Sequence, residues 1–241
     1  MREVTNERGE MMATIVLVHG AYQGGWIFSR VAPILRAAGH LVYAPTLDGC
    51  AERRHALRPG ITTQTHGTEI AELLFYEDLH EVVLVGTSAG GMVVCSAAEQ
   101  APERIGRIVL ADALALLPGE RIGDIVVNRT PRVTTALATG PSPEDARNRM
   151  FASLDPSTLE WTLARYTPHP IAAMEEPVKL DRFWQQSWHA SVIWCKRSVN
   201  PPVAHQRRAA DRLKARWLEL DTGHYPMLTE PEQLAKLIMA A

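Results

Sequence analysis

The 241-residue chain has little of several features that would assign it to particular classes of protein. Its three cysteines form no CxxC pair, which argues against a zinc knuckle or a disulfide framework and suits reduced thiols in a cytoplasmic protein. The formal net charge is only −2, so no basic excess favours nucleic acid or an anionic membrane surface as a partner. No apolar run approaches the ~20 residues that a membrane-spanning helix needs. We therefore expect a cytoplasmic protein, a monomer or homodimer, whose partner is a small molecule.

The first residues also lack a feature, the apolar stretch of a secretory signal peptide. They are polar from Arg2 to Glu10. We interpret residues 1–12 as a disordered N-terminal extension and expect the fold to begin at residue 13.

What the sequence does contain is a series of short apolar runs rich in β-branched residues. Such runs are typical of strands buried on both faces of a parallel sheet. Helix-like segments alternate with them, for example 28–38, 68–76, 209–215 and 231–239. This alternation predicts an α/β domain with a mostly parallel, doubly wound sheet. The expected strands are 14–18, 41–44, the run from 82, 108–111, 191–195 and 217–220.

The alternation is interrupted between residues 118 and 189. This segment has eight prolines, helix-like pieces and no strong strand pattern. We interpret 118–189 as a small helical cap inserted after the fourth or fifth recognisable strand, with the core formed by 13–117 and 190–241. The cap is expected over the carboxyl ends of the strands, where open α/β sheets bind ligands.

The stretch from residue 82 to 90 contains a candidate catalytic residue. An apolar run from Val82 leads into Gly86-Thr87-Ser88-Ala89-Gly90, and a helix-compatible run follows. G-x-S-x-G between a strand and a helix fits a nucleophile elbow, in which a sharp turn exposes the serine hydroxyl at the start of the helix. Glycine is needed at the flanking positions because the backbone approaches closely there.

Three motifs together resemble the α/β-hydrolase superfamily: His19-Gly20 after the first strand, the Ser88 elbow, and the segment from Asp221 through His224 to Leu228. The loop from His19 to Trp26 and the small cap are similar to the plant methylesterase and hydroxynitrile lyase group and its bacterial relatives. The resemblance implies that Ser88 is the nucleophile and His224 its base, in the chain order Ser…Asp…His. His19 is expected to shape the loop, not to react.

The acid of the triad is where this sequence departs from that family. The family's usual aspartate position corresponds to Ser198, and the turn from Lys196 to Asn200 has no carboxylate. Asp112, at the end of a neighbouring strand, is our preferred acid, since some relatives carry the acid there. Asp221 remains an alternative, as does a dyad supported by Ser198, Asn200 or water.

The resemblance also implies an oxyanion hole, made by the backbone N–H groups of Ala21 and Ala89. Tyr22 and Trp26 are expected either to form pocket walls or to pack the loop onto the cap. The full set of candidate substrate-binding side chains is Tyr22, Trp26, Trp161 and Trp184.

A serine nucleophile implies an acyl-enzyme, and esters are the expected substrates, with amides and lactones left open. A serine at position 88 excludes the chemistry of epoxide hydrolases and haloalkane dehalogenases, which use an aspartate nucleophile. Related hydroxynitrile lyases carry a lysine directly after the catalytic histidine, so Tyr225 at that position argues against cyanohydrin cleavage. An apolar cap favours a neutral, hydrophobic or aromatic acyl group. We expect no metal and no cofactor. The alternative from another class is a receptor-like protein that binds a small molecule without turnover.

Overall fold

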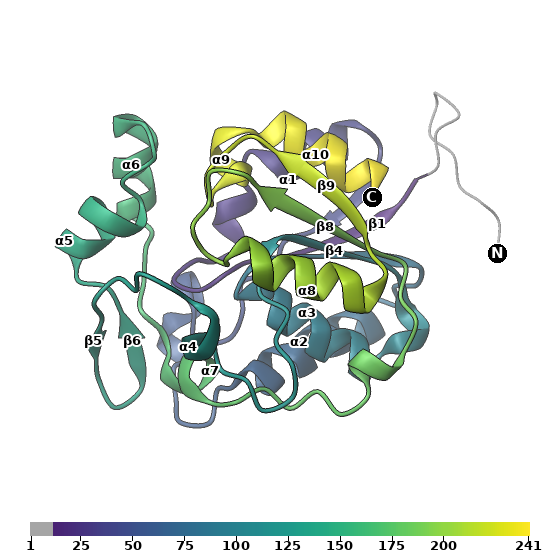
Figure 1. Cartoon of the computed structure of the whole chain (residues 1–241), viewed down its shortest axis with the longest axis horizontal. Helices are drawn as coiled ribbons and strands as arrows, with labels where there is room; N and C mark the ends of the chain where they lie inside the picture. The colour runs from purple at the N-terminus through teal and green to yellow at the C-terminus, as the bar shows by residue number, and fades with distance from the viewer. Residues whose placement is uncertain (1–11) are drawn as a thin grey trace.

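The computed structural model describes residues 12–241, so the expected extension at 1–12 lies, except for Met12, outside the described residues. A six-stranded sheet forms the centre of the molecule, in the order β2-β1-β3-β4-β8-β9 (Figure 1). Every neighbouring pair in it is parallel. Its strands are β1 Thr14–Val18, β2 Leu41–Tyr43, β3 Val82–Ser88, β4 Ile105–Ala113, β8 Ala190–Cys195 and β9 Arg216–Leu220.

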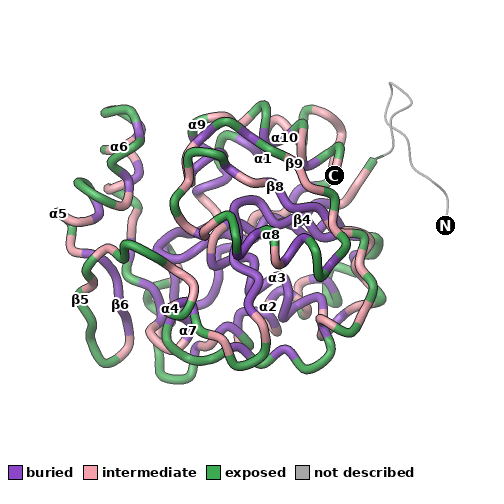
Figure 2. The backbone as a smooth tube through the Cα atoms, viewed as in Figure 1, coloured by how far each residue is buried: buried purple, intermediate pink, exposed green. Residues whose placement is uncertain are grey.

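Helices cover both faces of this sheet, as the alternating pattern predicts. α2 (Thr63–Tyr76), α3 (Gly90–Gln100) and α8 (Val203–Leu213) pack on one face, below the sheet in Figure 1. α1 (Val31–Ala37) and α10 (Pro231–Ala240) pack on the other. Successive residues of each strand point to opposite faces, so the sheet contributes side chains to two apolar cores, one on each face. Figure 2 shows β4 and β8 as buried along most of their length, whereas β9 at the edge of the sheet is more exposed.

Two helices begin earlier than the sequence pattern suggests. α2 begins at Thr63 and not at 68, because the Thr62 and Thr65 side chains each bond the other residue's backbone N–H in a capping box. α8 begins at Val203, directly after Pro202, and not at 209. Its first turns carry few apolar residues, so hydrophobic periodicity located only its end.

The segment 118–189 contains more than helices. Three strands, β5 (Val133–Thr134), β6 (Ala138–Gly140) and β7 (His169–Pro170), form a separate antiparallel sheet beside the helical pieces. Strands of two or three residues are too short to produce an alternating pattern, so the expectation of a purely helical cap missed them. The helical pieces are α4 (Ile122–Ile125), α5 (Pro143–Asp145), a π-helical turn (Ala146–Met150), α6 (Pro156–Leu163), α7 (Ile171–Glu175) and a 3-10 turn (Phe183–Gln185).

Candidate active site

Ser88 lies on the sharp turn between β3 and α3 that the G-x-S-x-G pattern predicts. Its φ of 51° is in the left-handed region, which is strained for a residue with a side chain. The flanking glycines make the turn possible. A Cβ on Gly86 would lie 2.8 Å from the Gly90 carbonyl oxygen, and a Cβ on Gly90 would lie 2.4 Å from that of Val18.

His224 lies in the turn between β9 and α9 (Pro226–Thr229), and its Nδ1 faces the Asp112 carboxylate. The Nδ1–Oδ2 distance is 2.6 Å. Such a contact fixes the orientation of the ring and places the proton on Nδ1, so that Nε2 is the nitrogen that can accept a proton. Both Ser88 and His224 line one cavity, although no hydrogen bond joins them within residues 12–241. Bonds between a base and its nucleophile are often long before substrate binds.

Asp112 reaches His224 through an irregularity in β4. The register between β3 and β4 passes from Thr87–Ala111 to Ser88–Ala113, which leaves Asp112 as the extra residue of a bulge. Its φ is 47°, and its side chain is 1% exposed. A bulge re-aims a side chain, here toward His224. The other carboxylate oxygen, Oδ1, accepts a 2.7 Å hydrogen bond from Gln206 Nε2 of α8.

The alternative acids are placed differently. Ser198 Oγ lies 3.4 Å from His224 Nδ1, but its hydroxyl donates to the Asn200 carbonyl at 2.9 Å. The Asn200 side chain is bonded to the Val127 backbone. The Asp221 side chain is 71% exposed and pairs with Arg197. Of the carboxylates considered, only that of Asp112 contacts His224.

The two backbone groups assigned to the oxyanion hole border the same cavity. Neither the Ala21 nor the Ala89 N–H donates a hydrogen bond to any group of residues 12–241. The loop with Ala21 comes close to the nucleophile, since a Cβ on Gly20 would lie 2.6 Å from Ser88 Cβ. Two free N–H groups beside a serine hydroxyl are suited to a developing oxyanion.

His19 braces this loop from inside. Its Nδ1–H donates to the Gly20 carbonyl at 2.8 Å, and its Nε2 accepts from the Leu47 N–H at 3.0 Å. Burial lowers the pKa of the His19 imidazole to about 4. A neutral imidazole with a hydrogen bond at each ring nitrogen has a structural role, which is the role expected for His19 from the sequence.

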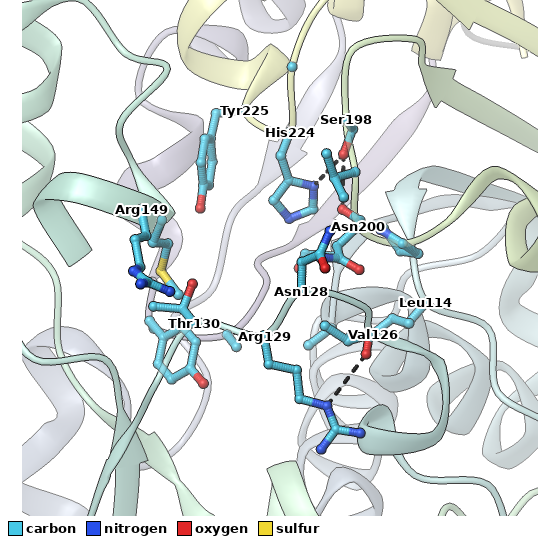
Figure 3. A pocket seen from close by; sticks show the side chains of 18 of the residues that line it. Leu114, Val126, Asn128, Arg129, Thr130, Arg149, Ser198, Asn200, His224 and Tyr225 are labelled. Atoms are coloured by element: carbon cyan, nitrogen blue, oxygen red, sulfur yellow. Dashed lines mark hydrogen bonds between the residues drawn. The ribbon is translucent and has the colours of Figure 1, made fainter. Parts of the chain in front are cut away.

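The cavity above Ser88 has a volume of about 700 Å³ and is lined by both the core and the segment 118–189 (Figure 3). Much of its wall is apolar. The apolar side chains include Tyr22, Leu114, Ile122, Val126, Met150, Met174 and Tyr225. Within residues 12–241 no group of three or more histidine, cysteine or acidic side chains is arranged to hold a metal ion.

Residues 15–237 match the model of the alpha/beta hydrolase family. The chain belongs to this family. Over 179 residues, 70% of this chain and 74% of the relative, it is 31% identical to a carbendazim hydrolyzing esterase of Nocardioides sp. strain SG-4G. It is 25% identical to methylesterase 3 of Arabidopsis thaliana, over 93% and 94% of the two chains. These relatives confirm the resemblance to the methylesterase group and identify the chain as an esterase-type hydrolase.

A solved structure of an extracellular alpha/beta-hydrolase from a Paenibacillus species has the same fold as this α/β-hydrolase. The TM-score is 0.81 at 22% identity, with 95% of this chain and 98% of the other covered. The predicted α/β-hydrolase architecture is thereby confirmed. No helix within residues 12–241 is both long and apolar enough to span a bilayer.

Three of the four aromatic residues expected in the pocket of this α/β-hydrolase lie outside its lining. Trp26 and Trp161 pack edge to face, with ring centroids 5.3 Å apart, and fill space against the core that contains α1 and α10. Trp184 donates from Nε1 to the Leu116 carbonyl and packs against Phe183. Only Tyr22 lines the cavity. The tryptophans serve as packing residues because each finds an apolar partner in the folded chain.

Sequence reasoning also missed charged residues of the cavity. Four arginines line it, namely Arg129, Arg132, Arg149 and Arg197. The sequence analysis placed no basic residue in the pocket, so its argument for a neutral acyl group did not take these arginines into account. These arginines are spread over 69 positions and form no local motif, so no signal in the sequence could predict that they line one cavity. Sequence reasoning likewise gave no role to Gln206, which donates to Asp112 from the neighbouring helix α8.

The second cavity, beneath the Gly20 loop, is lined by His19, His66 and His169 and has room for about 10 Å³. A water molecule barely fits such a space. The larger cavity is therefore the site to which function is assigned.

Proposed function

We propose that this α/β-hydrolase is a serine esterase that cleaves a carboxylic ester of a small hydrophobic or aromatic substrate through an acyl-enzyme. The observation that carries the proposal is the 2.6 Å contact between Asp112 and His224 at the cavity that Ser88 lines. A carboxylate there orients the imidazole and stabilises the imidazolium that forms when the base accepts a proton. The names of the relatives, an esterase and a methylesterase, support the same chemistry.

In the first half-reaction, Ser88 Oγ attacks the ester carbonyl carbon and its proton passes to Nε2 of His224. Negative charge develops on the carbonyl oxygen, and the N–H groups of Ala21 and Ala89 donate to it. His224 returns the proton to the leaving alcohol as the carbon–oxygen bond breaks. The Asp112 carboxylate stabilises the positive charge on the His224 ring while the proton is transferred.

In the second half-reaction, His224 takes a proton from water, and the hydroxide attacks the acyl carbon. The proton then returns to Ser88 Oγ and the acid is released. Esters are favoured over amides because a leaving alcohol needs less help from protonation than a leaving amine. The apolar wall formed by Ile122, Val126 and Met174 supports a hydrophobic or aromatic substrate.

The test is covalent labelling with a fluorophosphonate, combined with hydrolysis of para-nitrophenyl butyrate. We expect the protein to be labelled at Ser88 and to hydrolyse the ester, and Ser88→Ala to lose both properties. Ser153→Ala is the matched control, because Ser153 lines the same cavity but contacts neither Asp112 nor His224 in any hydrogen bond. A folded protein that is neither labelled nor active would overturn the proposal and favour a binding protein without turnover.

A further inference from the structure

The charged residues around the cavity are distributed unevenly. In the whole chain 27 acidic side chains outnumber 25 basic ones, yet the cavity is lined by four arginines and a single carboxylate, that of Glu230. Arg197 and Glu230 belong to the core side of the cavity. The side formed by residues 122–174 has three arginines, Arg129, Arg132 and Arg149, and no carboxylate. This side of the cavity is therefore cationic.

Carboxylates behind the wall neutralise some of this charge but not all of it. Arg132 Nη2 lies 2.5 Å from Glu175 Oε1, and Arg149 Nε lies 3.4 Å from Asp145 Oδ1. Arg129 has no carboxylate within 4.0 Å in the part of the chain that the structure describes. Its guanidinium donates to the backbone carbonyls of Gly123 and Val126 instead (Figure 3). About one positive charge thus remains unpaired on this wall.

Arg132 joins the cationic wall to a side chain of the core. Its side chain is only 25% exposed, and it neighbours the phenol of Tyr22, the residue after Ala21. Burial raises the pKa of Tyr22, and the Arg132 guanidinium opposes that rise. A partly desolvated guanidinium attracts an anion more strongly than an exposed one. It also presents two parallel N–H groups to a carboxylate.

The core supplies Ser88, His224 and the oxyanion groups, so a bound ester has its reacting end at the sheet. The rest of the substrate then extends toward residues 122–174. In Figure 3 Arg149 lies across the cavity from Ser198 and Asn200. A substrate that spans the cavity would bring its distal end to the arginines.

We propose that Arg129 and Arg132 form a subsite for a carboxylate carried at the distal end of the substrate. The substrate class is then a half-ester of a dicarboxylic acid, with an apolar or aromatic spacer between the ester and the free carboxylate. One unpaired positive charge matches one carboxylate. This inference rests on the proposed esterase function and specifies its substrate.

The test compares two esters of equal chain length, para-nitrophenyl hexanoate and the mono-para-nitrophenyl ester of hexanedioic acid. They differ only in the terminal carboxylate, and both release the same chromophore. Spontaneous hydrolysis is measured separately and subtracted. We expect Arg129→Gln and the double variant Arg129→Gln/Arg132→Gln to lower kcat/KM for the anionic ester by roughly tenfold or more. For hexanoate we expect a clearly smaller loss than for the anionic ester in each variant, with melting temperatures compared to verify folding.

Arg147→Gln is the matched control. Arg147 belongs to the same segment and pairs with Glu160, but it does not line the cavity. Raising the NaCl concentration should weaken the preference of the wild type for the anionic ester and leave hexanoate hydrolysis unchanged. Equal effects of Arg129→Gln on both esters, or none on either, would overturn the subsite while esterase activity persists. Failure of the wild type to hydrolyse either ester would instead contradict the proposed function.

Discussion

At the scale of single residues, the site depends on where the carboxylate behind His224 comes from. The family's usual position holds Ser198, whose hydroxyl is committed to the Asn200 carbonyl. The bulge in β4 directs Asp112 toward His224, and the Asp112 carboxylate accepts from both His224 and Gln206. We infer that this carboxylate takes the role that the neutral Ser198, in the turn after the neighbouring strand β8, cannot fill.

We expect Asp112→Asn to lower kcat by two or more orders of magnitude, because loss of the triad acid costs on the order of 10⁴ in rate. Asp221→Asn should remain near wild type, since the Asp221 side chain is exposed and faces Arg197. Ser198→Ala should lose less than about tenfold, because a 3.4 Å contact is a weak hydrogen bond. Steady-state hydrolysis of one ester by the three variants checks this ranking, and a fully active Asp112→Asn would contradict it.

Gln206 is a positioning residue in this scheme. Its Nε2 donates to Asp112 at 2.7 Å and to the Pro201 carbonyl at 2.9 Å, while its Oε1 is buried without a partner. An unsatisfied buried oxygen costs ~1–3 kcal/mol, so this orientation of the amide is held by its two donated bonds.

Replacing Gln206 by methionine keeps the length of the side chain but removes both donated bonds. We expect kcat to fall about tenfold or more while KM changes little, because Gln206 does not line the cavity. His205→Gln, at the neighbouring buried position of α8, should keep kcat near wild type. A rise in KM with unchanged kcat for Gln206→Met would show that its effect is on the cavity and not on Asp112.

At the scale of elements, the side-chain amide of Asn200 links the cavity wall at Val127 to the core. Asn200 Oδ1 accepts from the Val127 N–H at 2.9 Å, and Asn200 Nδ2 donates to the Val127 carbonyl at 2.7 Å. The amide therefore pairs with the backbone as a neighbouring strand would. We infer that residues 126–130, which include Arg129, depend on this pairing for their position in the cavity wall.

Loss of this pairing should loosen the segment. We expect Asn200→Ala to increase the rate of trypsin cleavage after Arg129 several-fold, because local opening exposes the backbone to the protease. Val199→Ala is the control, as Val199 is exposed beside Asn200 and contributes no such hydrogen bonds. Mass spectrometry of the fragments identifies the cleaved bond. An unchanged cleavage rate would mean that other contacts hold the segment.

At the scale of the whole molecule, several histidines are buried in the neutral form. Burial lowers the pKa of His19 and of His205 to about 4 and places that of His169 well below its usual range. In the unfolded chain these groups titrate near 6.5. Between pH ~6.5 and ~4 the unfolded state therefore binds more protons than the folded state, and the free energy of unfolding falls as the pH falls.

We expect chemical denaturation to give a lower free energy of unfolding at pH 4.5 than at pH 7. His19 alone contributes on the order of 3 kcal/mol to this loss once the pH has reached its folded-state value. His19→Asn should make the pH dependence shallower, and His55→Asn should not, because His55 is exposed. A free energy of unfolding that stays constant or rises toward pH 4.5 would contradict the buried neutral histidines.

The sequence by itself determined the parts of this protein that depend on local patterns. Apolar runs such as 14–18 and 82–88 specify strands buried on both faces, and strands that alternate with helices build a parallel sheet. The elbow at Ser88 follows from glycines that the tight turn requires. The position of His224 in the chain order also predicted that it is the base.

Tertiary structure decided which distant side chains meet. Asp112 was one candidate among several until the bulge in β4 brought it to His224. Between residues 118 and 189 the strands are too short to produce a periodic pattern, so spacing could not show which face of this segment meets the cavity. As a result, Trp161 and Trp184 pack outside the cavity, while Arg129 and Arg132 line it. Long-range packing, which no local pattern encodes, set the chemical character of the pocket.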